Sequence, residues 1–286
     1  MEKIVSIIDK SFMPGSEKKN FLSIELSPGG FSYCILDTDK FKYRVLESFA
    51  FGYPLDEENI SNASEYLIKS NELLQNDYER VSISYVSPQF VFIPEDIYVD
   101  SEKKSYLDFN VQLDDDNFFV NSEKLNNLKA YSVYPVAKVI TSMLFKFFPE
   151  LRIRHYTSPL IESIMYNVAV SNLNADVILH LNNGFFEIII IENNTLKLVK
   201  AFNFITYDDL MYYVFFTLEN MGFDAEKLNL KIIGNVSMES ELYKNIRLYF
   251  KSVSFGERND LYRYSSVFDN IPHHYFYGLL NLNVCG

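Results

Sequence analysis

Two stretches of the chain repeat one pattern of β-rich runs and turns. Residues 21–51 read FLSIELSPGGFSYCILDTDKFKYRVLESFAF, and residues 176–204 read DVILHLNNGFFEIIIIENNTLKLVKAFNF. In both, a glycine-containing turn precedes Phe31 or Phe185, and a second polar turn precedes a run that ends aromatic-x-aromatic. Because Gly, Pro and Asn favour tight turns, the pattern predicts three hairpin-linked strands, present twice through an internal duplication. The four turns lie at residues 28–30, 37–39, 182–184 and 193–194.

A helix and a further strand are expected after each set of three strands. Asn62 and Glu65 have the spacing of a capping box, and Thr206 and Asp209 have the same spacing after the second set. An apolar run at residues 188–191 is typical of a strand covered on both faces. The chain is therefore expected to be an α/β protein made of two β-β-β-α-β-α units. The expected helices span residues 62–75 and 207–221, and the strands after them residues 80–85 and 229–233.

The domain limits follow from the two repeats. We expect a first domain at residues 1–156 and a second at residues 157–286. Residues 95–130 interrupt the first half with a short helical segment and two short strands, so they are expected to form an inserted subdomain. The aromatic-rich residues 271–282 are expected to form a C-terminal helix that packs back towards the first domain.

Composition and charge limit the partners and the compartment. Lys and Arg number 26 against 38 Asp and Glu, which gives a formal net charge of −12. An acidic surface repels phosphate backbones and anionic lipids, so neither nucleic acid nor a membrane surface is an expected partner. Cys34 and Cys285 lie far apart, and the adjacent His273 and His274 point apart, so no disulfide scaffold or metal site is expected. No apolar run reaches the roughly 18 residues of a membrane helix, so we expect no membrane insertion and a cytoplasmic location.

The two units together resemble the actin-like ATPase superfamily, which includes sugar kinases, heat-shock chaperones and actin. The resemblance implies two domains, each built on a ribonuclease H-like β-β-β-α-β-α unit, with a cleft between them. The insertion in the first half is most similar to the pilus- and secretion-assembly branch. The resemblance extends from about Phe21 to the C-terminus and points to an uncharacterised bacterial family with this fold. It also implies three loops that bind ATP and a divalent metal.

The first of these loops is degenerate. The superfamily carries Asp-x-Gly in the first hairpin, where the Asp acts on metal-bound water and the Gly leaves room for phosphate. The matching positions here are Glu25 and Ser27, and Gly29 and Gly30 are displaced along the turn. Glu keeps a carboxylate of the kind that Mg²⁺ binds. Its extra methylene and the Ser side chain, however, intrude on the place of the phosphates.

The second and third loops depart further from the superfamily pattern. The second hairpin has His180 and Asn182 at the two matching positions, with Gly184 displaced, so both carboxylate and phosphate-side glycine are replaced. The third loop, a Gly-Gly pair beside the adenosine in the superfamily, reads Gly234-Asn235 and keeps one glycine. The resemblance therefore implies a weakened nucleotide site.

Each of these positions also has a purely structural reading. Glu25 alternates with apolar residues and is expected to be a solvated carboxylate on a strand face. His180 is expected to be a half-buried, hydrogen-bonded histidine. Gly234 is expected to form a turn from a strand into a helix that Ser237 caps.

The sequence favours a non-catalytic protein that acts through protein contacts. No catalytic residue, metal ligand or cofactor is assigned. A protein partner is expected because the fold resemblance occurs together with loss of the paired carboxylates. Tyr, which is enriched at interfaces, clusters at residues 207–213 and 262–277, and packing of these side chains between the layers of a large α/β core is an equally good reading. The alternative is a divergent Mg-ATP-binding protein, ATPase or kinase that uses the interdomain cleft, with Glu25 on metal-bound water and Gly234 beside the adenosine. Weak Mg-ATP binding without turnover is part of that alternative.

Overall fold

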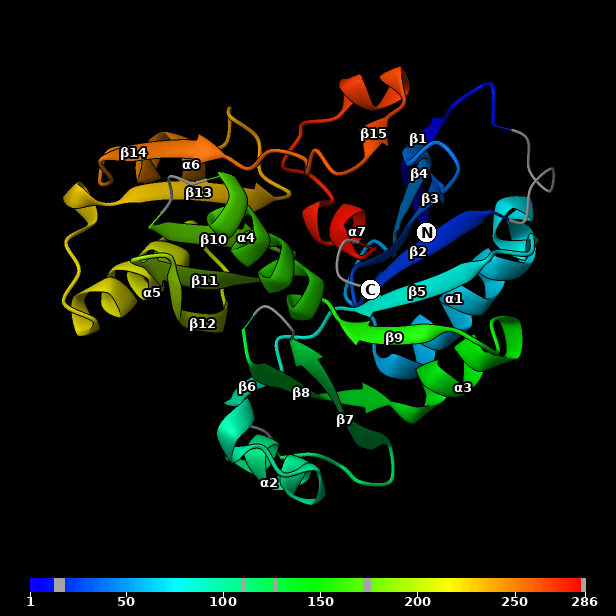
Figure 1. The fold of residues 1–286 in the computed structure, drawn as a ribbon, viewed down its shortest axis with the longest axis horizontal. Helices are drawn as coiled ribbons and strands as arrows, with labels where there is room; N and C mark the ends of the chain where they lie inside the picture. Colours follow the sequence, from blue (N-terminus) through cyan, green and yellow to red (C-terminus); the bar gives the residue numbers. More distant parts are fainter. Residues whose placement is uncertain (13–18, 110–111, 126–127, 172–175, 284–286) are drawn as a thin grey trace. The chain divides into compact units, whose positions relative to one another are not determined.

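The computed structural model describes residues 1–12, 19–109, 112–125, 128–171 and 176–283, which fall into two compact α/β units (Figure 1). The first unit contains Met1–Ser163, Asn259–Asn270 and the residues from Gly278 onward. The second unit contains Ile164–Arg258 and Ile271–Tyr277. The chain therefore returns to the first unit at Asn259, enters the second unit again at Ile271 and returns to the first unit at Gly278.

The first unit contains a sheet with the strand order β1-β4-β3-β2-β5-β9. Strands β2, β3 and β4 form the two antiparallel hairpins predicted for residues 21–51, and β5 and β9 run parallel to β2. The edge strand β1 was not foreseen from the sequence, and a short strand, β15, pairs with β4 beside it. The strands are β1 (Glu2–Ile8), β2 (Asn20–Ser27), β3 (Gly30–Asp37), β4 (Lys42–Ala50), β5 (Arg80–Tyr85), β9 (Arg152–His155) and β15 (Arg263–Tyr264).

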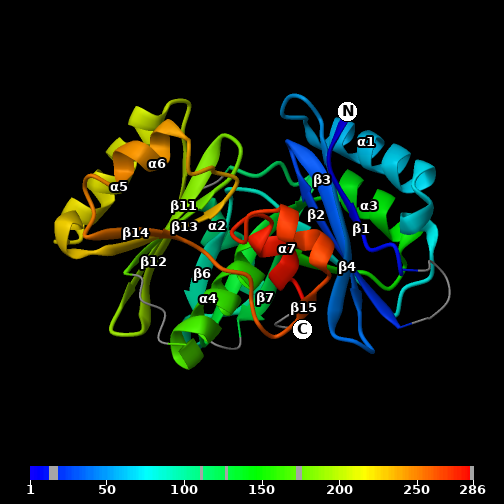
Figure 2. The ribbon, with the colours of Figure 1, turned by 90° about the horizontal axis from the view of Figure 1, so that it is seen from above.

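Two helices, α1 (Glu57–Ser70) and α3 (Lys138–Phe147), cover one face of this sheet (Figure 2). Alternate residues of β2 such as Ile24 point into this core because successive strand residues face opposite sides. The capping box predicted at Asn62 and Glu65 is wrong. The helix begins earlier, because the Asp56 side chain accepts a hydrogen bond from the Asn59 N–H and caps it there. A separate 3₁₀ helix, η1 (Glu72–Gln75), follows α1.

A smaller antiparallel sheet, with the order β6-β8-β7, also belongs to the first unit. Arg154 of β9 ties it in place: the guanidinium lies 2.6 Å from Glu123 of β7 and 2.8 Å from Glu162 of the next helix, α4. Arg154 and Glu162 are both buried, so the ion pairs replace the water that these charges lose. The elements are β6 (Val91–Pro94), η2 (Glu95–Ile97), η3 (Asp100–Glu102), α2 (Lys103–Asp108), β7 (Phe118–Leu125), β8 (Ala130–Ala137) and α4 (Thr157–Ser171).

The second unit contains a sheet with the order β12-β11-β10-β13-β14, in which the first three strands are antiparallel and the last two parallel. Asn193 and Asn194 both have positive φ and form the predicted turn between β11 and β12. The predicted capping box of Thr206 and Asp209 is confirmed at the start of α5. The elements are β10 (Val177–Leu181), β11 (Phe185–Glu192), β12 (Thr195–Asn203), α5 (Tyr207–Asn220), η4 (Ala225–Lys227), β13 (Asn229–Gly234), α6 (Glu241–Ile246) and β14 (Ser252–Phe255).

The two sheets share one topology. The strand run β4-β3-β2-β5-β9 in the first unit and the run β12-β11-β10-β13-β14 in the second have the same sequence of antiparallel and parallel pairings. The predicted α/β class with two similar sheets is therefore correct. Descent of both units from one duplicated ancestor stays a prediction.

The C-terminal part of the chain is less helical than predicted. After η5 (Ser266–Asn270), only α7 (Tyr277–Asn281) is an α-helix within the expected residues 271–282. Residues 278–283 pack in the first unit, where Tyr43 donates a hydrogen bond to the Leu280 carbonyl at 2.8 Å. Cys285 lies outside the described residues. In the described ranges, no helix is both long and apolar enough to cross a membrane.

Candidate functional site

The first hairpin places Ser27, Gly29 and Gly30 at the tight turn between β2 and β3, and Glu25 lies in β2 just before that turn. The Gly30 N–H donates to Ser27 Oγ at 3.0 Å, so the serine hydroxyl that replaces the superfamily glycine closes the turn. A Cβ on Gly30 would lie 2.4 Å from the Phe49 carbonyl oxygen of β4. Gly30 is therefore explained by the close approach of β3 to β4, and Gly29 contributes its carbonyl to the Phe51 N–H at 3.0 Å.

Glu25 lies on the face of β2 opposite the helix-covered core, and it is half-buried rather than solvated as expected. This face meets the C-terminal residues: a Cβ on Gly278 of α7 would lie 3.2 Å from Glu25 Oε2. Two residues earlier on the same face, Ser23 accepts a hydrogen bond from the Asn283 side chain at 2.7 Å. The carboxylate that would serve a metal is therefore covered in part by a segment of its own unit.

In the second hairpin, His180 and Asn182 bind the carboxylate of Glu187, which is not among the predicted site residues. His180 Nδ1 lies 2.7 Å from Oε2 of Glu187, and the Asn182 amide nitrogen donates to the same oxygen at 3.1 Å. Glu187 is completely buried, and His180 is 6% exposed. His180 is thus a hydrogen-bonded histidine, as its structural reading predicted, although it is more deeply buried. Gly184, at φ +84°, forms the turn itself.

A sequence signal for Glu187 exists, because it is the one charged residue within the apolar stretch of residues 185–191. A carboxylate in such a strand needs internal donors, since burial without them is costly. Its donors could not be named, however, without the register that places Glu187 directly opposite His180.

The third loop begins at Gly234, where the backbone approach leaves no room for a side chain. Gly234 has φ +93°, and a Cβ there would lie 2.2 Å from the Leu181 carbonyl oxygen at the end of β10. Leu181 pairs with Gly234, and its carbonyl accepts the Asn235 N–H at 3.3 Å, so the second and third loops lie together in the second unit. The N-cap predicted at Ser237 is wrong: α6 begins at Glu241, and the Ser240 hydroxyl caps it.

His274 fills the third loop from the C-terminal side. Its carbonyl accepts the Gly234 N–H at 2.9 Å, and its Nε2 lies 2.7 Å from the Val236 carbonyl oxygen. Its ring stacks on Phe255 with 4.1 Å between centroids. Burial lowers the pKa of His274 below its ordinary value, so the neutral imidazole donates from Nε2 to Val236. His274 is therefore a structural partner of this loop, which its sequence position alone did not indicate.

Several backbone donors of these loops are used inside the chain. A phosphate-binding loop presents several N–H groups to the phosphate oxygens. Here the N–H groups of Gly30, Asn182, Gly234 and Asn235 all donate to acceptors of this chain. Mg²⁺ prefers several oxygen ligands, whereas Glu25 lies against α7 and Glu187 is bound to His180 and Asn182. The residues of these loops thus do not fit a metal-nucleotide complex.

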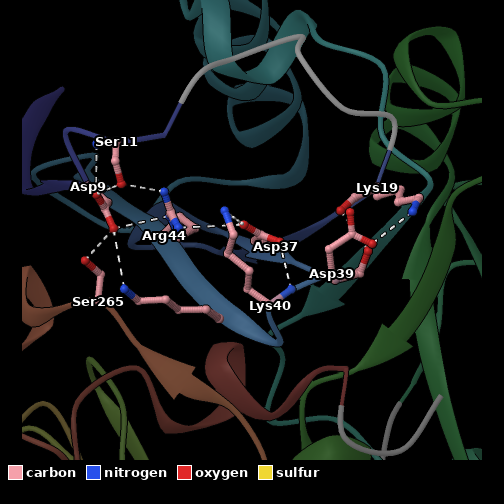
Figure 3. Close-up of polar contacts among 10 residues, drawn as sticks. Asp9, Ser11, Lys19, Asp37, Asp39, Lys40, Arg44 and Ser265 are labelled. Carbon is pink, nitrogen blue, oxygen red and sulfur yellow. Dashed lines mark hydrogen bonds and ion pairs between the residues drawn. The ribbon is translucent and has the colours of Figure 1, made fainter.

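A separate polar cluster lies in the first unit at the end of β1 (Figure 3). Asp9 accepts hydrogen bonds from Ser11 and, at 2.7 Å, from Ser265, and its carboxylate lies 3.2 Å from Arg44 Nε. Burial alone would raise the pKa of Asp9, but these hydrogen bonds and the Arg44 charge hold it well below its usual range. The cluster fastens the returning segment at Ser265 to the first sheet. In the described part of the chain, no group of three or more His, Cys, Asp or Glu side chains is arranged to hold a metal ion.

The fold is similar to solved structures of actin-like proteins. A Bacteroides thetaiotaomicron protein with an actin-like ATPase fold and unknown function gives a TM-score of 0.71 at 21% identity, over 84% of this chain and 91% of that one. The PilM-PilN type IV pilus biogenesis complex gives a TM-score of 0.63 at 9% identity, over 92% and 97% of the two chains. The likeness confirms the predicted two-domain actin-like ATPase fold.

Sequence comparison places the chain in a family. No curated protein matches it. A family model described as "Protein of unknown function (DUF3822)" matches residues 9–253, which is most of the chain. The chain therefore belongs to the DUF3822 family.

Proposed function

We propose that this protein is a non-catalytic member of the actin-like fold that acts in the cytoplasm by binding another protein. The observation that carries the proposal is the closure of the third loop, where Gly234 donates to the backbone of His274 and the His274 ring stacks on Phe255. A loop whose donor and adjoining aromatic face are already taken has little left to offer a nucleotide. The replaced carboxylate positions, Glu25 and His180, support the same conclusion.

Exposed aromatic side chains on the second unit support a protein partner. Tyr212 and Phe216 of α5 are 61% and 48% exposed, and their rings stack with 5.8 Å between centroids. Tyr249, which is 49% exposed, lies edge-on to the partly buried Phe215 of the same helix α5, with 5.1 Å between the ring centroids of Tyr249 and Phe215. We call Tyr212, Phe215, Phe216 and Tyr249 the aromatic surface. Exposed apolar patches, rather than single exposed residues, mark interaction sites. The similar fold in the PilM-PilN complex occurs together with a second protein.

The first experiment measures thermal unfolding of the full chain with and without Mg-ATP. A ligand at about 100 times its dissociation constant stabilises a native state by about 2.7 kcal/mol, which is a visible shift. We expect no shift with Mg-ATP, with ATP and chelator, or with Mg²⁺ alone. A Mg²⁺-dependent shift that Glu25→Gln abolishes would contradict the proposal and favour a divergent Mg-ATP-binding protein.

The second experiment is affinity capture with a pair of variants. Replacing Tyr212 and Phe216 together by Ser removes half of the aromatic surface, whereas Tyr66→Ser removes an exposed aromatic from α1, where Tyr66 is 64% exposed. We expect one reproducible partner with the wild-type chain and with Tyr66→Ser, and its loss with the double variant. Robust ATP turnover together with no reproducible partner would overturn the proposed function. If the wild type, Tyr66→Ser and the double variant all captured the partner equally, the partner would bind elsewhere than at the aromatic surface.

A further inference from the structure

The turn between β10 and β11 contains the only Asn-Gly pair in the sequence, Asn183-Gly184. Both residues are exposed. We propose that Asn183 is a site of spontaneous deamidation in the folded protein. The inference is independent of the proposed function, because it depends on the chemistry of one turn.

The reaction uses only the chain and water. The Gly184 backbone nitrogen attacks the side-chain carbonyl carbon of Asn183, forms a new C–N bond and expels ammonia, which leaves a five-membered succinimide ring. Water then opens the ring at one of its two carbonyls, giving aspartate or isoaspartate at position 183. The sum is one water consumed and one ammonia released, with no change of oxidation state. Glycine allows the attack best, because it has no side chain to obstruct the ring.

The turn leaves the attacking nitrogen available. In the described residues the Gly184 N–H donates to no acceptor, whereas its carbonyl is held by the Phe204 N–H at 3.0 Å. A Cβ built on Gly184 would meet no atom within 4 Å, so the space around this residue is open. The turn is closed on its inner side by the Asn182 N–H, which donates to the Phe185 carbonyl at 3.0 Å. The Gly184 nitrogen and the Asn183 side-chain amide are therefore adjacent and both accessible to water.

The chain contains an internal control in Asn121-Ser122, which lies in β7. Here the residue after the asparagine has a side chain, and Asn121 and Ser122 are paired in register with β8. The Asn121 amide also donates to the Tyr134 hydroxyl at 3.0 Å. Extended, sheet-bound backbone holds the side-chain carbon away from the next nitrogen, so Asn121 is expected to stay intact.

Deamidation would change the hairpin that carries the buried Glu187. Aspartate adds a negative charge next to Asn182, which donates to Glu187 at 3.1 Å. Isoaspartate also adds a methylene to the backbone, which lengthens a turn that the Asn182–Phe185 hydrogen bond closes. The modified chain should therefore unfold at a lower denaturant concentration than the fresh chain.

The test is peptide mapping by mass spectrometry of the full folded chain, incubated in mildly alkaline buffer, with enzymatic detection of isoaspartate. We expect the peptide with Asn183 to gain the mass of amide-to-acid conversion and to contain both isomers, while the peptide with Asn121 stays unchanged. Asn183→Gln is the matched variant, because glutamine would need a slower six-membered ring, and it should remain free of isoaspartate at this turn. The proposal is overturned if Asn183 stays intact in the folded chain, whether or not the same chain deamidates in urea. Equal reaction at Asn121 and Asn183 would also overturn it.

Discussion

The two units differ in where their first hairpins carry a carboxylate. Glu25 of β2 pairs with Ser32 of β3, and His180 of β10 pairs with Glu187 of β11. Both pairs lie close to the turn of their hairpin. The first unit therefore carries its carboxylate on the first strand of the hairpin, and the second unit carries it on the second strand, directly across the ladder. At the sequence position of the superfamily carboxylate, the second unit has His180 and therefore no carboxylate. The structure nevertheless contains one on the paired residue of the next strand, Glu187.

The surroundings explain why only one of these carboxylates is closed off. Glu25 is half-buried beside Gly278, whose lack of a side chain leaves room for it. Glu187 is completely buried and has His180 and Asn182 as partners. A completely buried carboxylate needs hydrogen-bond partners inside the protein, because burial without them is costly. His180 and Asn182 are the partners that Glu187 requires.

We expect the largest difference in stability when each of these two carboxylates is removed. Glu187→Ala leaves His180 and Asn182 without their buried acceptor and opens a cavity between the strands, so it should lower the free energy of unfolding by about 3–5 kcal/mol. Glu25→Ala removes a group that keeps contact with water and should cost about 1 kcal/mol or less. Urea unfolding followed by circular dichroism measures both. Similar losses for the two variants would show that the hairpins do not differ in the way described.

A second pair of variants tests the turns of the second unit. Gly234→Ala places a Cβ 2.2 Å from the Leu181 carbonyl oxygen at a positive φ, and it should destabilise the chain by about 2–3 kcal/mol. Gly184→Ala has a positive φ but open space around it, so backbone strain alone should cost about 1 kcal/mol. The same urea midpoints give the comparison. If Gly184→Ala were the more harmful change, close approach of β10 and β13 would not be the reason for Gly234.

Acid should reveal a smaller effect in the first unit. The pKa of Asp9 is lowered in the folded chain, so the unfolded chain takes up this proton at a higher pH than the folded chain does. The stabilisation by ionised Asp9 is therefore complete well above its ordinary pKa and is lost as the pH falls below about 4. We expect the free energy of unfolding to decline over that range, and to decline less steeply in Asp9→Asn. The check is a series of urea midpoints from neutral to acid pH, and parallel curves for the two chains would contradict it.

Turn chemistry and capping made much of the fold predictable from the sequence. The turn at Asn193-Asn194 was found because asparagine tolerates positive φ, and both residues have it. The capping box at Thr206 and Asp209 was equally local, because its hydrogen bonds join residues three apart. The repeated order of strands, helix and strand then followed from placing such signals along the chain.

Features that depend on distant partners could not be found in this way. The strand β1 needs β4, from which it is separated by most of the first hairpins, and its short apolar run carries no signal of its own. The start of α1 was misplaced because Asp56 and Asn62 are both capable N-caps, and only the structure shows that Asp56 is used. In the candidate loops, the roles of Glu187 and His274 come from strand register and from the returning segment, neither of which is local.

The three-segment construction of the first unit has a consequence for how the protein is made. Domains generally fold as units, N-terminal first, while the chain leaves the ribosome. Here the hydrogen bonds of Ser23 with Asn283 and of Tyr43 with Leu280 cannot form until the end of synthesis, because Asn283 and Leu280 follow the whole second unit in the chain. The nascent first unit therefore exposes the unfinished side of its sheet throughout the synthesis of residues 164–258. A fragment that stops before residue 271 lacks pieces of both units, so the protein cannot be divided into independent halves by a single cut.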